Sequence, residues 1–173
     1  FFGIFGYNYL ASLRLANHDI RMSADRLADA TVNKIESTLT AAQKVCRSLA
    51  TFAESDGYDT NDVHRFLKAT ISDNPEVYGG VVGFEPNSIE KGLEYFCPYY
   101  FHQSNQVAYS DLGTPSFNYP AWEWYSLPKT SGVPAWSEPY FDEGAGNVLM
   151  TTYSIPFFRR RGKVPVFLPQ GFQ

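Results

Sequence analysis

WSEPYFDEGAGNVLMTTYSIPFF, residues 136–158, is the stretch of sequence that decides the fold. It joins an acidic and aromatic segment that ends at Asp142, through a glycine-containing turn at residues 144–146, to a run rich in β-branched and aromatic residues. A turn between two such segments is typical of antiparallel strands. We therefore expect a strand pair here that holds one acidic side chain among several rings.

The β character extends upstream of this stretch to Pro75. Three further segments read as strands, separated by Pro, Asn, Ser and Gly clusters that are typical of turns: VYGGVVGFE (77–85), LEYFCPYYFH (93–102) and QVAYS (106–110). The glycines inside the first segment predict the close approach of another backbone or of a ring; they are Gly79, Gly80 and Gly83.

Residues 111–135 contain four prolines, which predicts a long irregular loop and no helix or strand. The same segment carries Tyr119, Trp122, Trp124 and Tyr125. Long ordered loops in compact domains often carry function, so we expect this aromatic loop to contribute to a binding site.

The first part of the chain is helical in pattern. Residues 8–52 contain no Pro or Gly, and apolar side chains recur mostly three, four or seven positions apart: Leu13, Ile20, Leu27, Ile35, Leu39, Ala42, Cys46 and Leu49. A helix of about 45 residues spans about 65 Å, more than the diameter of a small domain, so part of it should protrude or pair. A second helix should begin with Thr60 as its cap and end near Ser72, before Asn74-Pro75.

Composition narrows the function classes. The chain has 173 residues, enough for one sizeable core, with 17% aromatic residues and a formal net charge of −4. This balance gives no reason to expect nucleic acid as a partner. The one dense basic run, Arg159 to Arg161 with Lys163, reads as a solvated turn between strands. Cys46 and Cys97 match no metal-site spacing and could form a disulfide or stay as buried thiols.

The two ends of the sequence are unusual. Residues 1–10 are apolar and aromatic, which suits either the end of a membrane helix or a packed helical turn. Residues 165–173 carry Pro165 and Pro169, which should interrupt a strand, so we expect an atypical or truncated tail there.

Several motifs in their order along the chain resemble the Cache family of PAS-like extracytoplasmic sensor domains. They are NPEVYGGVVGFEP (74–86), YFCPYYF (95–101), WEWYSLPK (122–129) and PAWSEPYFDEGAGNVLMTTYSIPFF (134–158). The sequence looks closest to double-Cache domains of membrane-anchored PP2C-type phosphatases that regulate sigma factors, and is similar to those of chemoreceptors and sensor kinases. The resemblance implies an α+β fold, with a signalling and dimerisation helix at 11–53 and a ligand-binding lobe at 54–164.

The resemblance also implies where a ligand would bind. In amino-acid-binding relatives a Trp-Tyr pair and an Asp in a Tyr-x-Asp turn line the pocket, and these positions correspond to Trp124, Tyr125 and Asp142. The full set of expected ligand-binding residues is Tyr99, Phe101, Tyr119, Trp122, Trp124, Tyr125, Tyr140 and Asp142. Those relatives place an Arg, which clamps a carboxylate, where this chain has Trp122. The ligand is therefore expected to be an amine or amino-acid-like, with an organic acid as a further option.

We thus expect an extracytoplasmic small-molecule sensor of a bacterial membrane receptor, homodimeric through its long helix, without cofactor or metal. Ligand closure of the aromatic loop and the Tyr-Phe-Asp turn is expected to move that helix. The alternative is a structural or dimerisation domain that binds nothing, in which Asp142 only braces the glycine turn. An enzyme is not expected: Glu138, Asp142 and Glu143 could supply a carboxylate pair, but no nucleophile, metal or phosphate-binding motif accompanies them.

Overall fold

A computed structural model describes the backbone of residues 2–143, 146–158, 165–168 and 170–171. Side chains are described for Tyr9 and for residues 12–143 and 146–158. The contacts divide the chain into two units, residues 1–39 and residues 40–173. The predicted basic run at residues 159–163 and part of the glycine turn lie outside the described residues.

The first unit is a single helical segment. Helix α1, Phe2–Glu54, begins in this unit and continues into the second. Its large apolar side chains in the first unit are exposed, with Leu13 at 42%, Ile20 at 65% and Leu27 at 70%. Within the described residues, no helix combines the length and the apolar character that crossing a membrane requires. The predicted long helix is confirmed, and the role of residues 1–10 stays a prediction.

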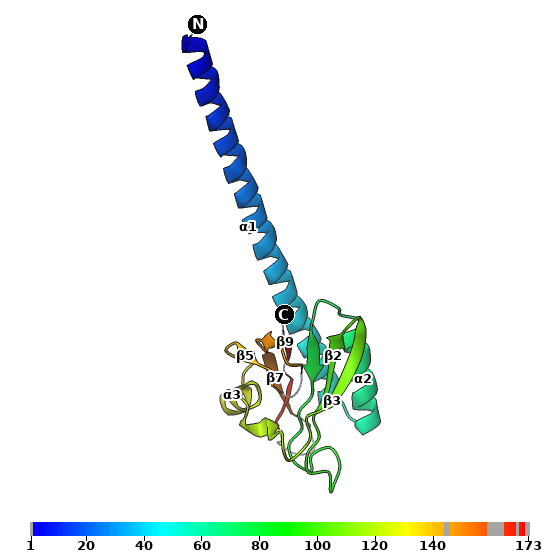
Figure 1. Ribbon diagram of the computed structural model, residues 1–173. Coiled ribbons are helices and arrows are strands. Elements are labelled where there is room, and N and C mark those ends of the chain that lie inside the picture. The colour runs from blue at the N-terminus through cyan, green and yellow to red at the C-terminus, as the bar shows by residue number, and fades with distance from the viewer. Residues whose placement is uncertain (1, 144–145, 159–164, 169, 172–173) are drawn as a thin grey trace. The chain divides into compact units, whose positions relative to one another are not determined.

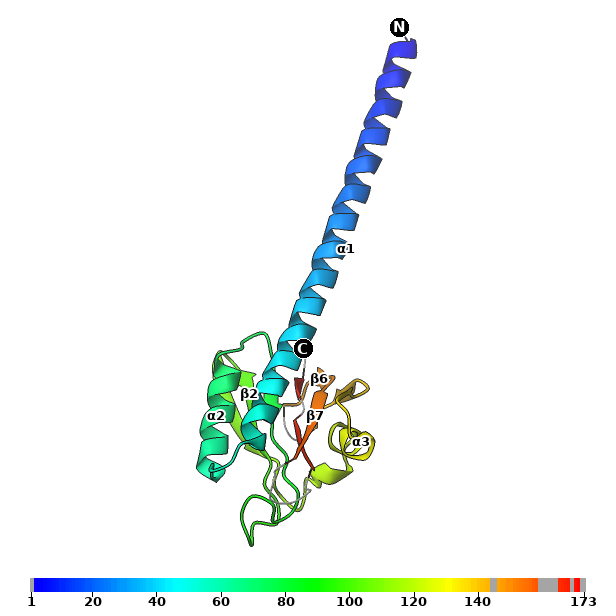
Figure 2. The same cartoon turned by 180° about the vertical axis from the view of Figure 1, so that it is seen from behind.

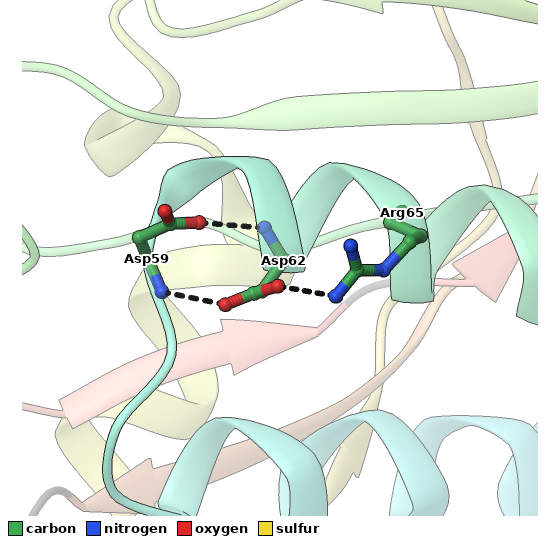
Figure 3. Close-up of polar contacts among 3 residues, drawn as sticks. All are labelled: Asp59, Asp62 and Arg65. Atoms are coloured by element: carbon green, nitrogen blue, oxygen red, sulfur yellow. Dashed lines mark hydrogen bonds and ion pairs between the residues drawn. The ribbon is translucent and has the colours of Figure 1, made fainter.

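The second helix packs against the sheet of the second unit through Val63, Leu67 and Ile71. Helix α2, Thr60–Ser72, has the predicted bounds, but its N-cap is Asp59 and not Thr60. The Asp59 carboxylate accepts a hydrogen bond from the Asp62 N–H at 2.9 Å, and the Asp62 carboxylate accepts one from the Asp59 N–H at 3.1 Å (Figure 3). This reciprocal capping box satisfies two backbone donors at the helix start, and Arg65 pairs with Asp62 one turn later.

The strands are short and antiparallel. One sheet has the order β3-β2-β1-β9, a second has the order β4-β7-β8, and β5 and β6 form a separate hairpin. Their bounds are β1 Gly79–Val81, β2 Pro98–Gln103, β3 Gln106–Asp111, β4 Ala135–Trp136, β5 Tyr140–Phe141, β6 Leu149–Met150, β7 Tyr153–Phe158, β8 Pro165–Leu168 and β9 Gln170–Gly171. The predicted α+β class and the strand pair around the Tyr-Phe-Asp turn are confirmed.

The expectation that proline would interrupt a strand near the C-terminal end was wrong for Pro165. Strand β8 begins at Pro165 and pairs with β7, with Pro165 opposite Phe158. Proline is tolerated at the first residue of a strand, because the ladder there does not need its missing N–H. Pro169 lies outside the described residues.

The expected irregular loop was also partly wrong. Residues 119–121 form a 3₁₀ turn, η1, and Glu123–Ser131 form helix α3. Pro128 lies inside α3, where it removes only one backbone donor. Gly132, in the left-handed region, ends the helix and donates its N–H to the Pro128 carbonyl at 2.9 Å. Helices α2 and α3 lie on opposite sides of the second unit (Figures 1 and 2).

Successive side chains of β2 point to opposite faces of the sheet and belong to two separate clusters of buried residues. Tyr100 faces a cluster built with the last part of α1, α2 and β7, whereas Tyr99 and Phe101 face a cluster built with η1 and α3. The glycines of the first strand segment permit close packing as predicted. A Cβ at Gly83 would meet the Tyr125 ring at 3.2 Å, and one at Gly80 would meet Ile71 at 2.8 Å.

Candidate functional site

A hollow beside the second cluster brings together residues from β1, β2, α3 and the β5–β6 hairpin. It is lined by Val81, Tyr99, Leu112, Trp124, Tyr140, Asp142, Met150 and Thr152. The space between these side chains totals about 260 Å³ when its open mouth is counted, whereas the room for the centre of a water-sized molecule is about 10 Å³. The hollow is therefore narrow, close to the minimum that one water molecule needs.

Asp142 follows β5 and is the acidic residue of the lining. It is 5% exposed, and its Oδ2 accepts a hydrogen bond from the Gly146 N–H at 2.7 Å. The Asp142 carbonyl accepts another from the Asn147 N–H at 2.9 Å. Asp142 thus braces the turn, as the structural alternative predicted, and also borders the hollow.

Two tyrosine hydroxyls lie beside this carboxylate. Tyr140 shares a hydrogen bond of 2.8 Å with the Thr152 hydroxyl. Tyr99 is 5% exposed, and its hydroxyl has no hydrogen-bond partner among the described residues. The Tyr99 hydroxyl is close enough to Asp142 to affect the titration of the carboxyl, although the pair falls short of hydrogen-bond geometry. One of the residues that line the hollow therefore carries a hydroxyl group without a hydrogen-bond partner among the described residues.

Burial dominates the electrostatics of the lining. It raises the pKa of Asp142 above the ordinary carboxyl value, and the Gly146 N–H and the Tyr99 hydroxyl partly oppose that rise. Burial also raises the pKa of Tyr99 and of Tyr140 well above the ordinary value. Both tyrosines therefore stay neutral at physiological pH, and Asp142 is the group of the lining whose charge a ligand would meet.

Tyr125, expected at the pocket, does not line this hollow. It is fully buried and donates a hydrogen bond to Glu85 Oε1 at 2.6 Å. Lys129 pairs with the same Glu85 oxygen and lies 5.5 Å from the centre of the Tyr125 ring. This arrangement ties α3 to the segment after β1. Trp124, the preceding residue of α3, borders the hollow instead.

The other expected residues lie around the hollow without lining it. Phe101 stacks on Tyr99 with ring centres 5.0 Å apart, and the Tyr119 hydroxyl donates to the Phe84 carbonyl. Trp122 stacks on Phe117 at 5.3 Å and meets the edge of Tyr140 at 5.8 Å. Of the eight expected residues, Tyr99, Trp124, Tyr140 and Asp142 border the hollow; ligand contact by any of the eight stays a prediction.

The lining residues that the sequence did not reveal are Val81, Leu112, Met150 and Thr152. Two of them are cross-strand partners of expected residues: Val81 lies opposite Tyr99, and Met150 lies opposite Tyr140. Residues opposite each other in antiparallel strands share a face. An explicit strand register would therefore have added both.

The remaining acidic and sulfur-bearing residues do not gather at this hollow. Glu138 and Glu143 are exposed, and neither lines it. Among the described residues, no group of three or more His, Cys, Asp or Glu side chains is placed to hold a metal ion. Cys46 and Cys97 are both buried and are not disulfide-bonded, so the structure shows the second of the two alternatives that the sequence left open.

Comparisons with known proteins agree on one family. Residues 63–166 match the model of the methyl-accepting chemotaxis protein-like first PDC sensor domain. The chain is 30% identical to the methyl-accepting chemotaxis protein TlpQ of Pseudomonas aeruginosa PAO1, over 58% of this chain and 18% of TlpQ. The chain thus spans less than a fifth of that relative.

Solved structures share the fold. The extracellular domain of soHK1S-Z6, a protein described as a histidine kinase, superimposes with a TM-score of 0.68 at 28% identity, over 81% of this chain and 55% of that one. The sensory domain of the Campylobacter jejuni chemoreceptor Tlp3, solved with isoleucine bound, gives a TM-score of 0.58 at 16% identity, over 83% and 55% of the two chains.

The predicted resemblance to Cache-type, PAS-like sensor domains of chemoreceptors and sensor kinases is confirmed, whereas a link to sigma-factor regulation is not shown. Sensor domains of these receptors detect signals and do not catalyse reactions. The match covers more than half of the chain and includes α2 from Val63 onward, strands β1 to β7 and the hairpin that bears Asp142. The chain therefore belongs to the family of first PDC sensor domains of methyl-accepting chemotaxis protein-like receptors.

Proposed function

We propose that this domain is the extracytoplasmic sensor of a bacterial membrane receptor and that it binds a small molecule through a protonated amino group at Asp142. The observation that carries the proposal is the buried Asp142 carboxylate, which borders a hollow with aromatic walls. A buried carboxylate is stabilised by a cation that donates hydrogen bonds to it, and the ring faces add cation–π attraction.

The absence of a cationic partner in the lining supports an amine over an organic acid. None of the described residues around the hollow is Lys, Arg or His. Trp122, at the place where amino-acid-binding relatives carry the carboxylate-clamping Arg, packs between the rings of Phe117 and Tyr140. A carboxylate ligand would therefore lack the forked partner that stabilises it, although Tlp3 was solved with isoleucine bound.

A thermal-shift and calorimetric screen of amines, amino acids and organic acids tests this function. We expect primary amines to raise the melting temperature and Asp142→Asn to weaken their binding at least tenfold. Glu143→Gln is the matched control, because it removes one negative charge from the adjacent, exposed position. Equal binding by wild type and Asp142→Asn, or a response to organic acids alone, would contradict the proposal.

We further propose that the domain pairs with a second copy through the exposed apolar stripe of α1, as the sequence predicted. Leu13, Ile20 and Leu27 recur at seven-residue intervals and are all exposed, a spacing that suits a coiled-coil seam. Ligand binding would then act by shifting the equilibrium between two arrangements of the pair, typically with about 1–3 kcal/mol of coupling.

Cysteine cross-linking tests the pairing. Ile20→Cys and Leu27→Cys should form disulfide-linked dimers, whereas Asp29→Cys, on the opposite side of the helix, should not. The native thiols of Cys46 and Cys97 are buried and should stay silent. Equal cross-linking at all three positions would argue against a defined seam, and patterns unaffected by a bound amine would argue against helix movement.

A further inference from the structure

We propose that the hollow at Asp142 selects a primary ammonium group over its N-methylated forms, and that the Tyr99 hydroxyl sets this preference. The proposal deepens the amine-binding function proposed above and rests on it. It assigns Tyr99 as a specificity-determining residue and names the ammonium group as the part of the ligand that the hollow recognises.

The first observation is the unpartnered hydroxyl of Tyr99. It is buried and has no hydrogen-bond partner among the described residues, and Tyr99 is one of the residues that line the hollow. An unsatisfied buried hydroxyl destabilises a protein. A ligand that donates a hydrogen bond to this oxygen removes that penalty, so the hydroxyl favours ligands with a spare N–H.

The second observation is that the Tyr99 ring is held in place. Tyr99 lies in β2 opposite Val81, and its ring stacks on Phe101 at 5.0 Å with an angle of 22° between the planes. A Cβ at Gly79 would come within 3.0 Å of the same ring. The hydroxyl therefore cannot swing away to find another partner without displacing the strand face.

The third observation is the convergence of several oxygen acceptors. Asp142, Tyr99, Tyr140 and Thr152 all line one hollow, and the hydroxyls of Tyr140 and Thr152 are hydrogen-bonded to each other. A primary ammonium carries three N–H donors, and each methyl group on nitrogen removes one of them. A trimethylated nitrogen would leave the Tyr99 hydroxyl unpartnered and would lose every hydrogen bond to the carboxylate.

The fourth observation is the size of the hollow. Its room for a water-sized centre is about 10 Å³, and an NH₃⁺ group is similar in size to water. The apolar walls are fixed by the interior: Val81 and Leu112 are each 4% exposed, and Trp124 is 3% exposed. Additional methyl groups would have to displace packed side chains, which is destabilising.

Isothermal calorimetry with a series of butylamines that differ only in the number of methyl groups on nitrogen tests the proposal. The probes are n-butylamine, N-methylbutylamine, N,N-dimethylbutylamine and butyltrimethylammonium, with wild type, Tyr99→Phe and Asp142→Asn. We expect wild type to lose about tenfold in affinity at the first methyl group and to show no binding of the trimethyl compound. Tyr99→Phe should weaken n-butylamine about fivefold and reduce the loss at the first methyl group to less than threefold.

Tyr109→Phe is the matched control, because Tyr109 also lies in the sheet but is 48% exposed and does not line the hollow. It should leave the whole series unchanged. The series on wild type needs no variant, so it tests the selection even if a substitution impairs folding. Tyr99→Phe is expected to fold, because it removes only an unsatisfied hydroxyl.

The outcomes separate the two proposals. If wild type binds the trimethyl compound as tightly as n-butylamine, or if Tyr99→Phe keeps the full loss at the first methyl group, the selection by Tyr99 is overturned. If Asp142→Asn binds every member as wild type does, or if no member binds to wild type, the amine-binding function itself fails. Loss of all binding in Asp142→Asn, together with a flat methyl series in wild type, overturns only the further inference.

Discussion

The two faces of the β1–β3 sheet differ in what they bury. The face toward α1 and α2 is filled by aliphatic residues such as Leu49, Leu67 and Ile71, all 1% exposed or less. The face toward α3 buries rings with hydroxyl groups, and beside them lie a carboxylate and an unpartnered tyrosine oxygen. The first face buries mainly apolar side chains, whereas the second also buries polar groups at some cost in stability, which fits the proposed binding of a ligand.

The comparison predicts that large aliphatic truncation damages folding without changing ligand choice. Leu67→Ala removes a fully buried side chain between α2 and the sheet and should lower the free energy of unfolding by about 2–5 kcal/mol. Denaturant unfolding measures this, and calorimetry at a temperature where the variant is folded should give an unchanged affinity for n-butylamine. A changed order of preference among the four butylamines would show that the aliphatic face also affects ligand selection.

The α3 side contains one polar cluster that should matter for stability. Tyr125→Phe removes the hydrogen bond to Glu85 and leaves Lys129 as the partner of that carboxylate. Because hydrogen bonds to charged groups are among the stronger ones, we expect a loss of about 1–2 kcal/mol. Tyr109→Phe should lose under about 0.5 kcal/mol, since Tyr109 is half exposed. Similar losses in both variants would show that the Glu85 contact contributes nothing.

The capping box of α2 should contribute to the stability of the aliphatic face. Asp59→Ala removes the side-chain acceptor for the Asp62 N–H and should lower the free energy of unfolding by about 1 kcal/mol. Arg65→Ala should change it by less than about 0.5 kcal/mol, because the Arg65 side chain is largely exposed and its pair with Asp62 is screened by solvent. Thermal melts of both variants check this order.

The smallest expected effect has the opposite sign. The folded-state pKa of Asp142 is raised by burial, so the stability that this group contributes is present below its unfolded pKa and is lost as pH rises through its folded pKa. Asp142→Asn without ligand should therefore melt like wild type at low pH and slightly above it at neutral pH. A lower melting temperature at neutral pH would mean that bracing of the turn outweighs the burial of charge.

Amine binding should depend on the ionisation of the same carboxyl group. A cation needs the ionised form of Asp142, and the raised pKa means that protonation begins at a higher pH than for an ordinary aspartate. We expect the affinity for n-butylamine to weaken as the pH falls toward the acid range, with no such dependence left in Asp142→Asn. Calorimetry from neutral pH downward measures this.

Local patterns were sufficient to predict the helices and most strands. The 3.6-residue period and the Gly and Pro boundaries located α2 between Thr60 and Ser72, although its N-cap is Asp59 and not Thr60. Helix α3 was missed because Pro115, Pro120 and Pro134, which lie outside it, were counted together with Pro128 inside it. Proline count describes a segment, whereas helix formation depends on each proline's place in it.

The candidate site could be predicted only in part, because its geometry depends on distant partners. Asp142 was assigned from the resemblance, through the Tyr-x-Asp turn that also contains Tyr140. Tyr125 was expected at the pocket from the Trp-Tyr pair of the relatives, but its hydroxyl donates to Glu85, 40 residues away in the sequence. Val81 joins the lining only through its pairing with Tyr99. Such long-range pairings are not visible in local sequence patterns.

Asp142 holds the Gly146 amide through one carboxylate oxygen, and the same residue lines the hollow. Occupancy of the hollow and order of the hairpin turn are therefore linked through a single side chain. The Gly146 amide proton becomes a built-in reporter: its hydrogen–deuterium exchange should slow when a cation neutralises the carboxylate, so a spectroscopist can observe the ligated state without labelling the ligand.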